Sequence, residues 1–253
     1  MAGHSRWHNI KHKKAISDAK RGKAWSKCVK AIMVAARNGG ADASTNLTLR
    51  YAIDEARYEN VPRDTIERAI KKGSGEIGDE TWENVRYEGY GPGGVAIICD
   101  ALTNNRTRTA ADLRLIFGDH DGKLGTSGCV AHQFDTKGRV VVEAPAPPHP
   151  AGDALFEAAA AAGADDVVPD AEQPGRWIVL TQPGDLHAVR TALEGGAFVV
   201  KEARIELIPT SVVQVSGAAA KRVLELMDAI DDNDDVQKAF ANFDIPDAEL
   251  AKL

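Results

Sequence analysis

Residues 1–30, MAGHSRWHNIKHKKAISDAKRGKAWSKCVK, hold nine lysine or arginine residues and a single acidic residue, Asp18. The basic residues are Arg6, Lys11, Lys13, Lys14, Lys20, Arg21, Lys23, Lys27 and Lys30. Such a run is costly to keep compact unless an anion neutralises it, and nucleic acid is the largest polyanion in a cell. These nine residues are therefore predicted to bind nucleic acid.

The rest of the chain has the opposite sign. Residues 1–72 carry 16 basic and 7 acidic residues, net +9, out of 31 and 37 in the whole chain. Residues 73–253 therefore carry 15 and 30, net −15. The isoelectric point of about 5.7 averages a basic module and an acidic body.

Helical periodicity gives the basic stretch two faces. At 100° per residue, four lysines fall within one stripe, called here the lysine stripe: Lys20, Lys23, Lys27 and Lys30. Apolar residues gather on the other side: Trp25, Val29, Ile32, Met33 and Ala36. One face is predicted to pack on a core and the other to meet a polyanion.

Local signals divide residues 14–73 into three helices. The first helix is predicted to end at Asn38 to Gly40. Asn46 starts a second helical pattern, and Pro62 suits the first turn of a third helix. Gly73 suits the position just beyond the last helix, and the glycines of residues 73–79 are typical of a linker.

After the linker, β-branched runs alternate with helical patterns. A buried strand is predicted over 95–102, a helix capped by Asn104 or Asn105 continues through Phe117, and another strand is predicted over 129–134. The final helix over 216–230 and strand over 236–243 lack partners of their own. They are predicted to return to the 95–134 unit.

Residues 139–208 show the order strand, helix, strand, strand, helix, strand, typical of the ferredoxin-like split βαβ arrangement. The predicted segments are 139–143, 153–163, 166–169, 177–181, 183–195 and 198–208, with a proline-rich loop over 144–152. We expect an α+β fold with a three-helix module and two ferredoxin-like α/β sandwich domains. The expected domains are 1–78, 79–136 with 210–253, and the inserted 137–209.

Several short motifs invite a ligand. His4, His8 and His12 recur every four residues, but the surrounding positive charge favours phosphate contact over metal binding. The glycines of 90–96 precede a strand instead of opening a helix, and those of 118–123 lack phosphate-loop spacing. Both are predicted to be turns. Trp7 could stack on a base, whereas Trp25 is predicted to lie in the core.

Residues 231–235, DDNDD, alternate like the start of an EF-hand, but Val236 and Asn242 stand where that loop needs glycine and glutamate. Calcium binding is therefore not expected. Two interpretations stay open: a solvated turn, or an acidic patch that docks the basic module when nucleic acid is absent.

Catalytic signals are weak. The sequence has neither GxSxG nor a cysteine with a local histidine signature, and His120 and His132 stand apart from candidate partners. The cysteines Cys28, Cys99 and Cys129 form no CxxC pair, which argues against disulfides and a zinc site. We therefore expect no enzyme activity, no cofactor and no metal. Because the sequence shows no apolar run and no leader pattern, we expect a cytoplasmic protein that contacts no membrane.

Six segments closely resemble the YebC/PmpR family of probable transcriptional regulatory proteins. They are MAGHSRW (1–7), NIKHKKAISDAKRGKAWSK (9–27), VPRDTIERAIKKG (61–73), RYEGYGPGGVAIICDALTNNRTRTAADLR (86–114), GKLGTSG (122–128) and VQKAFANFDI (236–245). The 144–152 loop and the 153–200 region diverge. The resemblance implies a three-domain α/β fold around a cleft, a cytoplasmic location and no known cofactor.

The resemblance implies two classes of function. Some family members look like promoter-binding DNA regulators, and others, including mitochondrial activators of cytochrome oxidase subunit I synthesis, look like factors acting on ribosomes. We expect a DNA-binding transcriptional regulator that contacts phosphates through its basic N-terminal residues. The alternative is a ribosome-associated translation factor that binds ribosomal RNA. In either case a monomer or weak dimer is expected.

Overall fold

The computed structural model describes residues 18–75, 82–143, 151–170, 173, 175–196, 198–246 and 249. These residues form seven α-helices and three β-sheets, so the predicted α+β class is confirmed. They fall into two compact units. The first contains the described residues up to Gln133 together with those from Ser211 onward, and the second is Phe134–Thr210.

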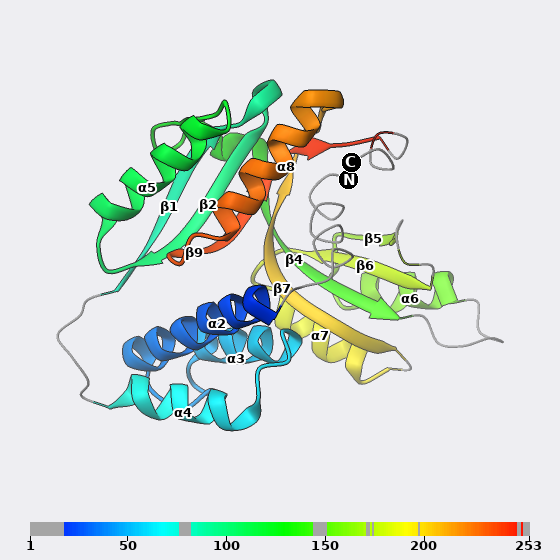
Figure 1. Cartoon of the computed structure of the whole chain (residues 1–253). Coiled ribbons are helices and arrows are strands. Elements are labelled where there is room, and N and C mark those ends of the chain that lie inside the picture. The colour runs from blue at the N-terminus through cyan, green and yellow to red at the C-terminus, as the bar shows by residue number, and fades with distance from the viewer. Residues whose placement is uncertain are drawn as a thin grey trace. The chain divides into compact units, whose positions relative to one another are not determined.

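The first unit begins with three helices: α2 (Asp18–Gly39), α3 (Leu47–Tyr58) and α4 (Arg63–Ser74) (Figure 1). The predicted start of the second helix at Asn46 is confirmed, and Asn46 also caps that helix: its side-chain oxygen accepts a hydrogen bond from the Leu49 backbone N–H at 3.0 Å. The Asn46 amide nitrogen also donates to the carbonyls of Ala35 and Gly40, both at 2.8 Å. One buried side chain therefore joins the end of α2 to the start of α3.

The three helices share one hydrophobic core, to which α2 contributes the face opposite its lysines. Trp25 packs on this core as predicted, and its indole N–H donates to the Glu59 carbonyl at 3.0 Å. The buried members of the core are Cys28, Ile32, Ala35, Ala36, Leu49, Ile53, Ala56, Val61, Ile66 and Ala69.

The prediction that Gly73 lies just beyond the third helix is wrong. Gly73 is buried inside the last turn of α4, where a Cβ atom would overlap the Met33 carbonyl oxygen of α2. A glycine here lets two helix backbones approach each other closely, and its value for packing outweighs its poor helix propensity.

The first unit also holds a four-stranded antiparallel sheet, in the order β3-β1-β2-β9. Its strands are β3 (Lys123–Leu124), β1 (Glu83–Tyr90), β2 (Ala96–Thr103) and β9 (Val236–Ala241). Two helices, α5 (Arg106–Asp119) and α8 (Gly217–Asp231), cover one face of this sheet (Figure 1). The predicted α5 cap is confirmed at Asn105, whose oxygen accepts from the Arg108 N–H at 3.1 Å.

The C-terminal segment returns to this sheet as predicted, because β9 pairs with β2. A short parallel pair follows, formed by β8 (Val213–Gln214) and β10 (Phe243–Asp244). Between β9 and β10, the buried Asn242 side chain accepts from the Ala96 N–H at 2.8 Å. The element order of this sheet, β1-β2-α5-β3 and then α8-β9, differs from the βαββαβ order of the second unit.

The predicted strand over 129–134 is wrong. Ala131–Gln133 is a 3-10 helix, η2, and the strand that follows α5 in this sheet is β3. The backbone N–H groups of Val130 and Ala131 donate to the Glu88 carboxylate, both at 2.9 Å, instead of to a neighbouring strand. The buried Glu88 side chain accepts the hydrogen bonds that a neighbouring strand would otherwise accept. The pattern of apolar residues along 129–134 does not indicate such a partner.

The second unit has the predicted order of elements: β4 (Phe134–Glu143), α6 (Ala151–Ala161), β5 (Asp166–Pro169), β6 (Arg176–Thr181), α7 (Leu186–Glu194) and β7 (Val199–Pro209). Its antiparallel sheet has the order β5-β6-β4-β7, which is that of a split βαβ arrangement. β4 starts earlier than predicted. Residues 144–150 of the proline-rich stretch lie outside the described part of the chain.

Candidate nucleic-acid interface

The predicted binding residues are described to different extents. Lys23, Lys27 and Lys30 are described on α2, on the face away from the helical core. Lys20 and Arg21 also belong to α2, but the structure does not describe their side chains. Arg6, Lys11, Lys13 and Lys14 lie outside the described residues, as do Trp7 and His4, His8 and His12.

Each of the three described stripe lysines contacts residues 231–235, which we call the acidic turn. Lys23 Nζ lies 3.3 Å from both the carbonyl oxygen and Oδ1 of Asp232. Lys27 Nζ donates to the Asp231 carbonyl at 2.6 Å. Of the two interpretations of DDNDD, the structure shows the docked one.

Lys30 completes this contact at the end of the acidic turn. Its Nζ lies 3.0 Å from Asp235 Oδ1 and 3.4 Å from the Asp234 carbonyl oxygen. The same ammonium stands over the Trp82 ring, 4.2 Å from its centroid, which adds a cation–π attraction. Trp82 was missed by sequence reasoning, because it lies beyond the linker and outside any periodic pattern.

The contact has a second electrostatic basis in α8. This helix ends at Asp231, and its last carbonyl groups have no partner within the helix. They form the negative end of the helix dipole, where cations are stabilising. Lys23 and Lys27 donate to two of these carbonyls, those of Asp232 and Asp231. The stripe therefore caps a helix end as well as meeting carboxylates.

Asp235 is the most firmly held acid of the turn. Its Oδ2 accepts from Arg108 Nη2 at 2.7 Å, from Thr109 Oγ1 at 2.8 Å and from Thr103 Oγ1 at 3.3 Å. Burial disfavours the charged carboxylate, but hydrogen bonds from Arg108, Thr109 and Lys30 outweigh it and lower the pKa of Asp235 to about 2. Asp235 therefore stays ionised at neutral pH.

Exposure differs along the stripe. The Lys23 side chain is 45% exposed and Asp232 is 51% exposed, whereas Lys30 and Asp235 are 15% and 9% exposed. In this structure, the face expected to meet a polyanion is thus covered at Lys30 and open at Lys23.

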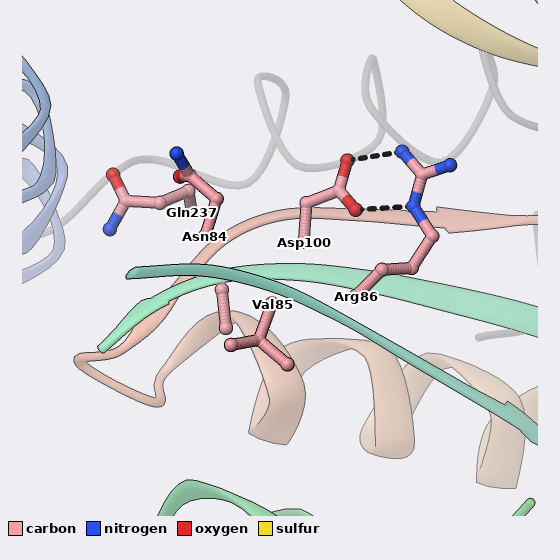
Figure 2. Close-up of a pocket in the computed structure, with 6 residues that line it drawn as sticks. Asn84, Val85, Arg86, Asp100 and Gln237 are labelled. Carbon is pink, nitrogen blue, oxygen red and sulfur yellow. Dashed lines mark hydrogen bonds and ion pairs between the residues drawn. The ribbon is translucent and has the colours of Figure 1, made fainter. Parts of the chain in front are cut away.

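A second polar surface lies on the β1-β2-β9 sheet. A hollow of about 420 Å³ is lined by Asn84, Val85, Arg86, Asp100, Ala101 and Gln237. Figure 2 shows Arg86 and Asp100 joined side by side on the face of the sheet away from Val85, with donor–acceptor distances of 2.7 and 2.9 Å. Because Asp100 occupies the guanidinium fork, this hollow offers a phosphate little uncompensated charge.

The glycine motif of 90–96 forms a turn, as predicted, whereas that of 118–123 does so only in part, because Gly118 lies within α5 and Lys123 begins β3. Pro92–Gly94 is a short 3-10 segment in which Gly93 and Gly94 have φ values of 72° and 78°. In GTSG, the Gly128 N–H donates to the Glu88 carboxylate at 2.8 Å. Burial opposes the charge of Glu88, but three backbone N–H groups lower its pKa. Sequence reasoning missed Glu88, whose partners lie some forty residues away.

Burial affects all three cysteine thiols, and His120 contacts a backbone carbonyl. Burial raises the pKa of Cys28 to about 12 and also raises the pKa of Cys99 and Cys129, so these side chains are thiols at neutral pH. His120 follows the end of α5, and its Nδ1 lies 2.8 Å from the Ile116 carbonyl. Among the described helices, none is both long and apolar enough to cross a membrane.

Comparison with known proteins covers almost the whole chain. A model of the TACO1/YebC protein N-terminal domain matches residues 5–76, and a model of the TACO1/YebC second and third domain matches residues 82–243. A "probable transcriptional regulatory protein" of Citrifermentans bemidjiense is 49% identical over 253 residues, 100% of both chains. A namesake from Geobacter sulfurreducens is 47% identical with the same coverage.

A solved structure shows the same fold. The crystal structure of a conserved hypothetical protein from Aquifex aeolicus is 42% identical, covers 91% of this chain and 93% of its own, and superposes with a TM-score of 0.77. The chain therefore belongs to the TACO1/YebC family.

Proposed function

We propose that this protein is a nucleic-acid-binding regulator of gene expression, and specifically a DNA-binding transcriptional regulator. The observation that carries the proposal is the geometry of α2. Its core face holds the helix in place, while Lys23, Lys27 and Lys30 follow one another along a different face. Ammonium groups spaced along a rigid helix suit the regular charges of a phosphate backbone. The names of the relatives support a role in transcription.

The full binding surface in this proposal includes all nine basic residues of the opening stretch, from Arg6 to Lys30. Lysine contacts phosphates as a point charge, and the described stripe has no Asn, Gln or Arg to read base edges. Sequence preference should therefore be modest. The protein would act in the cytoplasm as a monomer or weak dimer, without a cofactor.

The same observation favours one alternative, a ribosome-associated translation factor. A lysine stripe that grips phosphates does not distinguish DNA from ribosomal RNA. Crosslinking in cells, followed by sequencing of the bound nucleic acid, separates the two functions. Promoter DNA supports the first and ribosomal RNA the second.

Binding itself is tested with Lys20→Gln, Lys23→Gln, Lys27→Gln and Lys30→Gln combined. Fluorescence anisotropy with a duplex DNA, repeated over a range of salt, should show weaker binding and a shallower slope. The slope should fall by about 0.9 for each lost phosphate contact. A matched control replaces the exposed Lys71, Lys72, Lys123 and Lys221 with glutamine and should bind like the wild type.

Two outcomes contradict the proposal. If the stripe variant and the wild type bind duplex DNA and ribosomal RNA equally well, the stripe is not the binding surface. If the wild type has no salt-dependent affinity for either polymer, a regulator that binds only proteins is the better explanation.

A further inference from the structure

The acidic turn occupies the surface that the proposed function assigns to nucleic acid. Four of its five residues are aspartates, and the turn follows directly from the negative end of α8. All three described stripe lysines donate to it. Closely spaced carboxylates and carbonyls of this kind present oxygens to lysine much as a phosphate run does.

We propose that the acidic turn is a built-in competitor of nucleic acid, which must be displaced from the lysine stripe before phosphates can bind there. This inference rests on the proposed function, because it names a regulation of the same surface. An ammonium group that donates to the turn has fewer N–H donors and less uncompensated charge to offer a phosphate. The turn thus raises the concentration of nucleic acid needed for binding.

The contact is graded in strength along the stripe. Lys23 and Asp232 form an exposed pair, and such pairs change an equilibrium constant by less than about fivefold. At the other end, Lys30 meets an Asp235 that Arg108 and Thr109 also hold in place. Displacement should therefore begin at Lys23 and proceed to Lys27, with Lys30 released last.

Graded displacement predicts which polyanions bind. A single phosphate gains one contact and loses to the covalently tethered turn, whose effective concentration is high. A long backbone can bind the exposed Lys23 first and then replace the turn at successive lysines. The turn therefore favours long nucleic acids over short oligonucleotides and free nucleotides.

The test removes the three turn charges that the core does not need, with Asp231→Asn, Asp232→Asn and Asp234→Asn combined. Asp235 is kept because it is buried. Asparagine relieves the repulsion between aspartate and the α8 C-terminus, so the variant should fold. A control with the same change of net charge combines Asp119→Asn, Asp121→Asn and Glu225→Gln. Of these acids, Asp121 pairs with Arg222, and Glu225 pairs with Lys221 and Arg222.

The turn variant should bind a 20-base-pair duplex about fivefold more tightly than the wild type, because it removes the Lys23–Asp232 ion pair and two further negative charges beside the stripe. The control variant should gain less than about threefold, since its charges lie away from the stripe. Equal gains in DNA affinity for the turn variant and the control variant overturn the inference. They do so even if the lysine variants show that the stripe binds DNA, so the two proposals can fail separately.

A second measurement needs no nucleic acid. Acylation of the wild type with a lysine-reactive ester, followed by mass spectrometry, should modify Lys27 and Lys30 more slowly than the exposed Lys71 and Lys72. The turn variant should acylate faster than the wild type at Lys23, whose ion pair with Asp232 it removes, while Lys27 and Lys30 keep their carbonyl and Asp235 contacts. Equal rates at all four lysines in the wild type overturn the inference. If Lys27 and Lys30 are acylated slowly but the wild type binds no nucleic acid, the contact between the stripe and the acidic turn stands and the proposed function is refuted.

Discussion

Lys30 Nζ lies 3.0 Å from Oδ1 of Asp235, a residue 205 positions later in the chain. Both side chains are largely buried, and Arg108 and Thr109 complete the surroundings of the carboxylate. This pair ties the first described helix to the acidic turn, directly before the strand β9, within one unit. Its energetic role can be measured apart from any nucleic acid.

The first prediction concerns the pH dependence of Asp235. Its pKa is about 2 in the folded protein against an ordinary value of 3.8, so the charged form stabilises the fold above pH 4. That contribution, about 2 kcal/mol, should be lost as the pH falls from 4 towards 2. Urea unfolding should therefore show Asp235→Asn to be less stable than the wild type at pH 7, with the difference shrinking in acid. A difference independent of pH would contradict this assignment.

The second prediction concerns Glu88 and the GTSG turn. Its carboxylate accepts from the N–H groups of Gly128, Val130 and Ala131, at 2.8 to 2.9 Å. Glu88→Gln replaces one acceptor oxygen by a donor and should cost about 1.5–3 kcal/mol. Hydrogen exchange of these three amides should accelerate. The control Glu83→Gln removes only an exposed 3.7 Å pair with Arg106 and should leave the exchange rates unchanged.

The third prediction concerns close helix packing at Gly73. Gly73→Ala places a methyl group against the Met33 carbonyl and should lower the free energy of unfolding by about 1–3 kcal/mol. Gly118→Ala is the matched control, because a Cβ there meets nothing within 4 Å and alanine favours the helix α5. Chemical denaturation should show opposite signs for the two variants. A stabilising effect of Gly73→Ala would show that the helices have room to separate.

The fourth prediction concerns the Asn46 cap. Asn46→Ala removes the bond from the Leu49 N–H and leaves the Ala35 carbonyl without its side-chain donor. Loss of a cap together with buried hydrogen bonds should cost about 2–4 kcal/mol. At α5, the Asn105 side chain makes the cap bond alone, so Asn105→Ala should cost only about 1 kcal/mol. Thermal unfolding of the two variants should differ accordingly, and equal losses would argue against the extra role of Asn46.

Local features of the sequence were sufficient for most of the elements. Helices begin at Asn46 and Asn105 because a side-chain oxygen can satisfy a backbone N–H within three residues. The two faces of α2 follow from periodicity alone, since spacing along a helix fixes which residues share a side. In contrast, the sequence pattern did not predict the bounds of the strand β1, because the burial of its residues depends on which strands lie beside it.

The sequence by itself determined the α+β class, the caps and the separation of lysines from core residues on α2, because each depends on neighbours within a few positions. Its charge imbalance left docking of the acidic patch on the basic module as one of two open interpretations. Only the tertiary structure decided which atoms meet. Lys23, Lys27 and Lys30 face a turn more than 200 residues away, Glu88 replaces a strand partner for Val130, and Gly73 lies against Met33. Such contacts depend on chain pairing over long separations, which periodicity and propensity do not encode.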